Sequence, residues 1–106
     1  FDTFCPMGPW IVTRDELKDD DISVKCWVND ELRQSSNSKD LIFDVPTLIE
    51  TISAGITLYP GDIIATGTPA GVGLGFKPPK FLVAGDTVRM EVGGVGVLEN
   101  KLVNGA

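Results

Sequence analysis

Apolar and polar residues alternate along residues 22–28. Successive side chains of a strand point to opposite faces, so this alternation predicts a strand with one buried face. Asn29-Asp30 follows and indicates a hairpin turn. We therefore expect residues 31–34 to return antiparallel and the polar run 35–38 to form a loop.

A helical spacing of apolar residues comes next, at positions 45, 48, 49 and 52. Asp44 can cap this helix, and Pro46 falls in the first turn, where its missing N–H group costs nothing. Gly55 is suited to the position just beyond the helix C-terminus. We expect the apolar stripe of the helix to pack on a sheet.

Short apolar runs predict further strands over residues 10–13, 63–66, 87–92 and 96–103. The second and third runs follow the turns Pro60-Gly61-Asp62 and Ala84-Gly85-Asp86, in which glycine supplies a positive φ. The total is six or seven short strands and one helix. The chain is therefore predicted to be mainly β, with mixed or antiparallel sheets and one or two short helices.

Length and composition narrow the class of protein. The 106 residues suffice for one small domain, and a hydrophobic fraction of 42% argues against disorder. No apolar run approaches the roughly 20 residues of a membrane span. The net charge of −6 argues against nucleic-acid binding, which requires a basic surface. The chain begins with Phe1 and not methionine, so we expect more sequence upstream.

The two cysteines, Cys5 and Cys26, are too few for a disulfide scaffold. Cys26 lies on the apolar side of the alternating run, and we expect it to be a small buried residue. No signal peptide is visible. We therefore expect a reducing, cytoplasmic location, or a mitochondrial one in a eukaryote.

Five of the seven residues between Asp15 and Asp21 are acidic. This stretch is typical of a solvated loop. A cation site is the alternative, but the stretch lacks the glycine turn of a calcium-binding loop.

Residues 66–75 form the most unusual segment, with four glycines, two threonines and one proline directly after an apolar run. Glycines permit a ligand to approach the backbone, and exposed N–H groups can hold an anion such as a carboxylate. Thr66 and Thr68 would add hydroxyl groups on either side of Gly67. A purely structural loop that needs several positive φ angles is the alternative.

Known nucleotide-binding patterns do not fit this segment. A phosphate-binding P-loop needs Gly-Lys-Ser/Thr after its glycines, and a dinucleotide-binding fingerprint must open a helix. Here the chain continues into Lys77-Pro78-Pro79-Lys80. Lys77 and Lys80 are the local basic pair, more typical of a solvated loop than of a site.

A second candidate lies at residues 1–10, where Pro6 and Pro9 fix the backbone and Gly8 frees it locally. Phe4 and Met7 could form an apolar wall of a pocket. A rigid turn is the alternative. The chain contains no histidine, which rules out an intrachain Ser-His-Asp or Cys-His site.

Together these segments resemble the fumarylacetoacetate hydrolase family. The resemblance is carried, in matching order and spacing, by residues 1–9 (FDTFCPMGP), 28–31 (VNDE), 43–49 (FDVPTLI), 60–64 (PGDII) and 66–73 (TGTPAGVG). It covers essentially the whole chain. It implies a mixed β-sandwich roll that is incomplete in this chain, with residues 1–106 forming the C-terminal portion of a single catalytic domain, and usually a homodimer.

The resemblance also implies an activity. Enzymes of this family use Mg²⁺ or Mn²⁺ to act on small 2-oxo acids, acylpyruvates or 1,3-diketo acids, by C–C bond hydrolysis, decarboxylation or keto–enol isomerisation. The family's metal ligands are a Glu-x-Glu pair and a later aspartate. This chain contains no Glu-x-Glu, so those ligands and the active-site lysine are expected upstream of Phe1.

The resemblance assigns no catalytic residue and no metal ligand within this chain. Thr68 matches the threonine that contacts the substrate carboxylate, and Thr66 and Gly67 flank it. Three further residues match a pocket-lining segment: Pro6, Met7 and Gly8. The alternative to an enzyme is a non-catalytic structural or dimerising fragment of the same fold.

Overall fold

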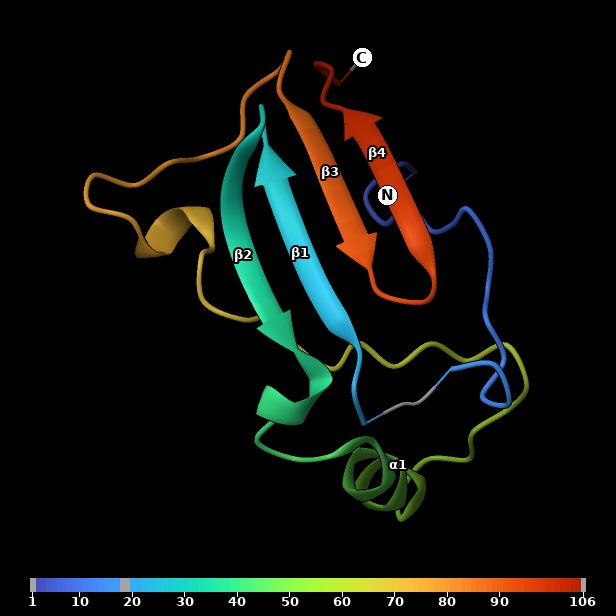
Figure 1. The fold of residues 1–106 in the computed structure, drawn as a ribbon. Helices are drawn as coiled ribbons and strands as arrows, with labels where there is room; N and C mark the ends of the chain where they lie inside the picture. The colour runs from blue at the N-terminus through green and yellow to red at the C-terminus, as the bar shows by residue number, and fades with distance from the viewer. Residues whose placement is uncertain (1, 18–19, 106) are drawn as a thin grey trace.

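The computed structural model describes residues 2–17 and 20–105, and its centre is a four-stranded antiparallel sheet with the order β2-β1-β3-β4 (Figure 1). The strands are β1 (Ser23–Val28), β2 (Glu31–Asn37), β3 (Thr87–Val92) and β4 (Gly96–Lys101). One α-helix, α1 (Val45–Ser53), and two short 3-10 helices, η1 (Ser38–Asp40) and η2 (Gly73–Gly75), complete the elements. The predicted fold class, mainly β with short helices, is confirmed.

The β1–β2 hairpin forms where the alternating pattern predicts it. Asn29 and Asp30 both have positive φ angles, 50° and 66°, as a tight two-residue hairpin turn requires. The prediction for residues 35–38 is wrong, because β2 continues to Asn37. These polar residues pair with residues 23–25 of β1, so the neighbouring strand and not their own polarity decides their conformation.

Two predicted strands, at residues 10–13 and 63–66, are not strands in the described structure. A strand exists only when its backbone bonds to a neighbouring strand, and neither segment belongs to the sheet. Trp10 instead donates its Nε1–H to the Val95 carbonyl oxygen at 2.6 Å. The described part of the chain therefore has four strands and not six or seven.

The helix begins and ends as its sequence predicts. Asp44 caps α1 by accepting the Thr47 N–H at 2.9 Å, and Gly55 follows its C-terminal turn. The expected packing of its apolar stripe on the sheet is wrong, since α1 lies beyond the end of the sheet where β1 begins (Figure 1). Val45, Leu48 and Ile52 are half-buried there, and Ile49 is 44% exposed.

The two Gly-Asp turns are built alike. In each, the aspartate N–H donates to a carbonyl three residues earlier, and the aspartate side chain accepts the N–H of that same residue: Asp62 with Tyr59, and Asp86 with Val83. Gly61 and Gly85 both have a φ of 100°. The shared sequence pattern thus predicts a shared turn.

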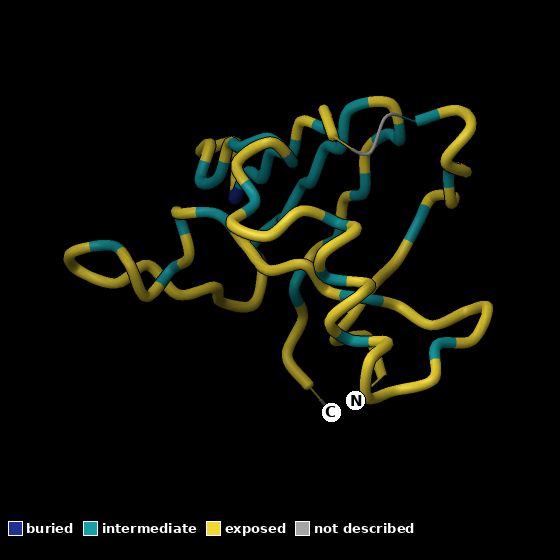
Figure 2. The backbone as a smooth tube through the Cα atoms, turned by 90° about the horizontal axis from the view of Figure 1, so that it is seen from below, coloured by how far each residue is buried: buried dark blue, intermediate teal, exposed yellow. Residues whose placement is uncertain are grey.

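Most of the chain is exposed (Figure 2). Val28, at 7% exposure, is the one residue buried among those described. The accessible surface is 8513 Å², whereas a folded monomer of this mass exposes about 5,800 Å². The radius of gyration is 15.4 Å against about 13 Å for a compact domain of this length. The chain thus exposes far more surface than a self-sufficient domain of its size.

No helix in the described ranges has the length and apolar character needed to cross a membrane.

Asp86 ties the hairpin turn to the start of β3, and its contribution to stability should depend on pH. The Val83 N–H and the Asn29 side chain donate to its carboxylate and hold its pKa below the ordinary value. A lowered folded-state pKa stabilises the fold above the unfolded value, about 3.9, and this contribution is lost as pH falls through the folded value.

We expect Asp86→Asn to lower the thermal unfolding midpoint of the full-length protein at pH 7, and we expect this deficit to shrink as pH falls below the unfolded-state pKa of about 3.9. Asp30→Asn removes the same charge from the neighbouring turn and is the control. A deficit for Asp86→Asn that stays constant from pH 7 to pH 3 would contradict the role of the ionised carboxylate.

Candidate functional site

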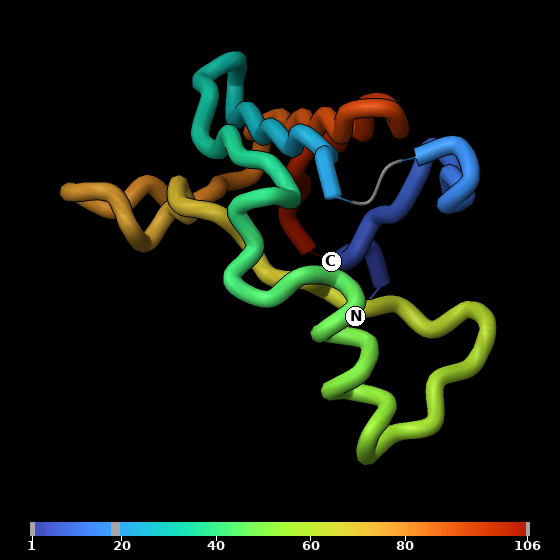
Figure 3. Tube along the Cα trace, turned by 60° about the horizontal axis from the view of Figure 1, so that its bottom comes forward, coloured from blue at the N-terminus to red at the C-terminus, as the bar shows by residue number. Residues whose placement is uncertain are grey.

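The glycine-rich loop, residues 66–73, lies against the outer edge of the sheet, next to β2. The chain leading into it, residues 55–65, swings away from the sheet and then returns (yellow-green in Figure 3). Thr66, Gly67 and Thr68 are exposed. Gly67 and Gly71 have positive φ angles of 98° and 112°, so the loop has the backbone that its glycines predict.

A side chain of β2 fixes the middle of the loop. Gln34 donates from Nε2 to the Thr68 hydroxyl oxygen at 2.7 Å and to the Pro69 carbonyl oxygen at 2.9 Å. Gln34 is paired with Cys26 in the β1–β2 ladder, immediately beside an irregularity in the register. The Thr68 hydroxyl is therefore exposed but held in place by the sheet.

The loop glycines divide into two kinds. A Cβ at Gly71 would overlap the Arg33 carbonyl oxygen, and one at Gly73 would overlap the Lys80 carbonyl oxygen. These two glycines let backbone pack on backbone, which is a structural role. A Cβ at Gly67 would meet nothing within 4 Å. Gly67 therefore leaves open space beside Thr66 and Thr68, where a ligand can approach.

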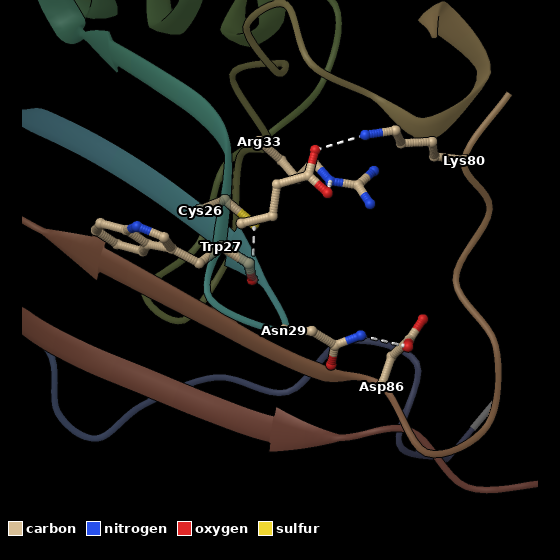
Figure 4. A network of polar contacts seen from close by, with 7 residues as sticks. Cys26, Trp27, Asn29, Arg33, Lys80 and Asp86 are labelled. Carbon is tan, nitrogen blue, oxygen red and sulfur yellow. Dashed lines mark hydrogen bonds and ion pairs between the residues drawn. The ribbon is translucent and has the colours of Figure 1, made fainter. Parts of the chain in front are cut away.

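A charged cluster holds the chain that follows the loop (Figure 4). Glu31 of β2 pairs with Lys80 at 2.6 Å and with Arg33 at 3.3 Å. Arg33 and Lys80 each lie 5.0 Å from the centre of the Phe76 ring. The hydrogen bond from Lys80 is the main cause that lowers the pKa of the Glu31 carboxyl group. This cluster anchors residues 76–80 to the same strand that holds Thr68.

An open groove of about 440 Å³ separates the sheet from residues 71–82. Its apolar lining comes from both sides: Val28, Val88, Val72, Leu74, Phe81 and Leu82. Cys26 also lines it and is half-buried rather than fully buried as expected. Burial raises the pKa of the Cys26 thiol, so this cysteine is neutral at physiological pH and a poor nucleophile.

The second predicted segment is mostly exposed. Pro6 and Met7 are exposed, and Gly8 is half-buried with a φ of 139°. The chain just after them is held at the β3–β4 hairpin, where Trp10 bonds to Val95. The loop at Thr68 is held by β2, which is the opposite edge of the sheet.

The structure thus groups Thr66, Gly67 and Thr68 in one loop and leaves Pro6, Met7 and Gly8 in a separate segment.

The described residues do not fit a divalent metal ion. In residues 2–17 and 20–105, no three side chains of His, Cys, Asp or Glu gather where they could hold one. In the acidic stretch, Asp21 pairs with Lys39 at 2.9 Å and accepts from Asn37 at 3.0 Å. Lys18 and Asp19 of that stretch lie outside the described residues.

Nothing in the sequence marks Gln34 as a residue of the site. It lies within the run expected to form the second strand of the hairpin, and 34 positions separate it from Thr68. Its sequence neighbours carry no signal of a site, because only the folded chain brings the two residues together.

The model of the C-terminal part of fumarylacetoacetate hydrolases matches residues 1–103. The chain belongs to the fumarylacetoacetate hydrolase family. The match covers the glycine-rich loop and the N-terminal segment alike, so the resemblance is confirmed over nearly the whole chain.

Among curated relatives, the oxaloacetate tautomerase YisK of Bacillus subtilis is 51% identical over 102 residues, which are 95% of this chain and 34% of the relative. A fumarylacetoacetate hydrolase structure from Exiguobacterium antarcticum superposes with a TM-score of 0.95 at 48% identity, covering 99% of this chain and 38% of that one. The chain spans about a third of the length of the curated relatives it matches.

The maleylpyruvate hydrolase of Sphingobium sp. SYK-6, in complex with manganese(II) and pyruvate, superposes with a TM-score of 0.89 at 48% identity. The match covers 100% of this chain and 38% of that one. Members of the fumarylacetoacetate hydrolase family therefore share this sheet and loop while their names describe different reactions.

The two kinds of loop glycine can be separated by substitution. Gly67→Ala places a Cβ at a positive φ in open space, and we expect a loss of about 1–2 kcal/mol in unfolding free energy. Gly71→Ala adds overlap with the Arg33 carbonyl group, and we expect a loss of about 3 kcal/mol or more. Denaturant unfolding of the full-length protein measures both, and equal losses would show that the loop does not pack on β2 as described.

Proposed function

We propose that this chain supplies the carboxylate-binding side of an enzyme that acts on small 2-oxo acids, acylpyruvates or 1,3-diketo acids. The reactions in this class are C–C bond hydrolysis, decarboxylation and keto–enol isomerisation. One observation carries the proposal: an exposed threonine, Thr68, is held by Gln34 in a loop that Gly67 leaves open.

The chemistry of the loop suits a carboxylate. A threonine hydroxyl and backbone N–H groups beside a glycine of positive φ are hydrogen-bond donors, and bonds to an ionised acceptor are about twice as strong as neutral ones. The chain carries a net charge of −6, so an anion needs such local donors to bind here. With no histidine, the chain is better suited to bind and orient a substrate than to transfer protons by imidazole.

The names of the relatives support the same class of substrate. Oxaloacetate, maleylpyruvate and pyruvate, which appear in the names of the tautomerase and of the hydrolase complex, are all small 2-oxo acids. Each carries a carboxylate beside a ketone. In our proposal Thr68, with Thr66 and Gly67, binds that carboxylate, and Pro6, Met7 and Gly8 line another part of the pocket.

In this proposal the complete enzyme uses Mg²⁺ or Mn²⁺ bound by residues outside this chain. The hydrolase that holds manganese(II) together with pyruvate supports a divalent ion, and the described residues here form no such ligand set. A bound divalent ion would supply stabilisation of negative charge on the substrate oxygen. The contribution of this chain is confined to holding the carboxylate.

The exposed surface supports further polypeptide packed on this chain. The accessible surface exceeds that of a monomer of this mass by roughly 2,700 Å², an area within the range of permanent interfaces. We propose that the rest of the enzyme and a second copy, in a homodimer, cover it. The free thiols of Cys5 and Cys26 favour a reducing compartment, the cytoplasm or a mitochondrion.

The role of Thr68 can be tested in the full-length enzyme with Mn²⁺. We expect Thr68→Ala to raise KM for oxaloacetate by about 10- to 100-fold, because a bond to a charged group is lost, and to leave the protein folded. Thr57→Ala, which removes another exposed threonine hydroxyl outside the loop, is the control. Unchanged kinetics for Thr68→Ala would show that the hydroxyl does not contact the substrate. If the unmodified enzyme turned over neither oxaloacetate nor any acylpyruvate, the proposed function would be wrong.

The metal proposal has its own test. We expect EDTA to abolish turnover by the full-length enzyme and Mn²⁺ to restore it. Asp20→Asn and Asp21→Asn should leave Mn²⁺ affinity unchanged, whereas disturbing a true ligand shell costs about 10- to 100-fold. Calorimetric titration with Mn²⁺ measures this, and a large loss of affinity in either variant would place a ligand in the acidic stretch.

A further inference from the structure

The hydrogen-bond partners of Gln34 fix the orientation of its amide group. The Pro69 carbonyl oxygen can only accept a hydrogen bond, so the Gln34 atom that faces it at 2.9 Å must be the nitrogen. The same nitrogen lies 2.7 Å from the Thr68 hydroxyl oxygen. An NH₂ group has two hydrogens, one for each of these oxygens.

The orientation of the amide determines whether the Thr68 hydroxyl accepts a hydrogen bond from Gln34 or donates one to it. Because Gln34 donates to this oxygen, the hydroxyl accepts on that side, and its own hydrogen must point elsewhere. Thr68 is exposed, and its neighbour Gly67 leaves open space. The hydrogen therefore points away from the Gln34 nitrogen and is available to an acceptor on the exposed side of the loop.

Contacts with β1 and with the loop hold Gln34 in place. It belongs to a strand paired with β1, and the contact of Gly71 with the Arg33 carbonyl group holds the loop at the same height on β2. Both acceptors of the Gln34 amide belong to the loop. A rotation of the amide would place its oxygen against the Pro69 carbonyl oxygen and lose that bond, and it would make the Thr68 hydroxyl the donor to Gln34.

We propose that Gln34 is a positioning residue for substrate binding: it fixes the Thr68 hydroxyl as a donor toward the substrate carboxylate. This inference rests on the proposed function, since it takes the ligand at Thr68 to be a carboxylate. Gln34 itself does not touch the substrate.

The test is a double-mutant cycle in the full-length enzyme, with Mn²⁺ present and pyruvate as the ligand. We expect Gln34→Leu to raise the Kd for pyruvate about 10-fold in the wild-type background and less than about 2-fold in the Thr68→Ala background. Ser35→Ala, an exposed neighbour on the same strand, is the control and should leave Kd unchanged. Equal effects of Gln34→Leu in both backgrounds would show a purely structural role and overturn the inference.

Gln34→Glu keeps the size of the side chain and makes its hydrogen bonding depend on pH. A role in packing alone would not make the Kd for pyruvate depend on pH in this way. A protonated glutamate donates to Thr68, whereas an ionised one accepts and turns the hydroxyl hydrogen away from the substrate. We expect its Kd for pyruvate to rise from about pH 4 to pH 7, and most of this rise to vanish in the Thr68→Ala background. Simple repulsion between two carboxylates would persist in that background, and its persistence in full would contradict the inference.

Different results would overturn the role of Gln34 and the proposed function. If wild-type enzyme binds pyruvate, Thr68→Ala weakens binding and Gln34→Leu does not, the inference is wrong and the proposed function stands. If neither wild-type enzyme nor any variant binds pyruvate with Mn²⁺, the proposed function is wrong, and the inference falls with it.

Discussion

The contact between β2 and the glycine-rich loop is the constraint on which the rest of the candidate site depends. Gln34 and the Arg33 carbonyl group on β2 meet Thr68, Pro69 and Gly71 of the loop. An exposed loop with several glycines would otherwise lose considerable conformational entropy on binding a ligand. Because the sheet already fixes its middle, the loop can present the Thr68 hydroxyl in one orientation.

The sheet that provides this support is itself incompletely covered. Val28 alone is buried among the described residues, and α1 stands beyond the end of the sheet. Hydrophobic burial is the main favourable term in folding, and this chain has little of it. The local contacts of β2 shape the loop, whereas the apolar faces of the described chain stay exposed.

Local sequence was enough to predict the elements whose partners are near in the chain. The β1–β2 hairpin, the capped helix and the two Gly-Asp turns follow from alternation, capping and turn chemistry. Residues 63–66 and 10–13 have equally apolar sequences but find no neighbouring strand in the described structure. Residues 35–37 are polar and are nevertheless a strand, because β1 lies beside them. Pairing over a distance is a tertiary property, and local patterns do not contain it.

In the candidate site, too, some residues can be predicted from local sequence and others only from the fold. Thr68 and Gly67 could be chosen from the sequence because glycines and hydroxyls cluster there. Gln34 could not, since its role arises only from a contact across 34 residues. The distinction between structural and open glycines also required the fold, because Gly71 and Gly67 have similar φ angles and differ only in what surrounds them.

A crystal structure of the full-length enzyme with Mn²⁺ and pyruvate would test the central claim most directly. The account predicts a pyruvate carboxylate oxygen at about 2.7 Å from the Thr68 hydroxyl oxygen, with the Gln34 amide still bonded to Thr68 and Pro69. A carboxylate bound away from residues 66–68, with the Thr68 hydroxyl facing only solvent or β2, would contradict it.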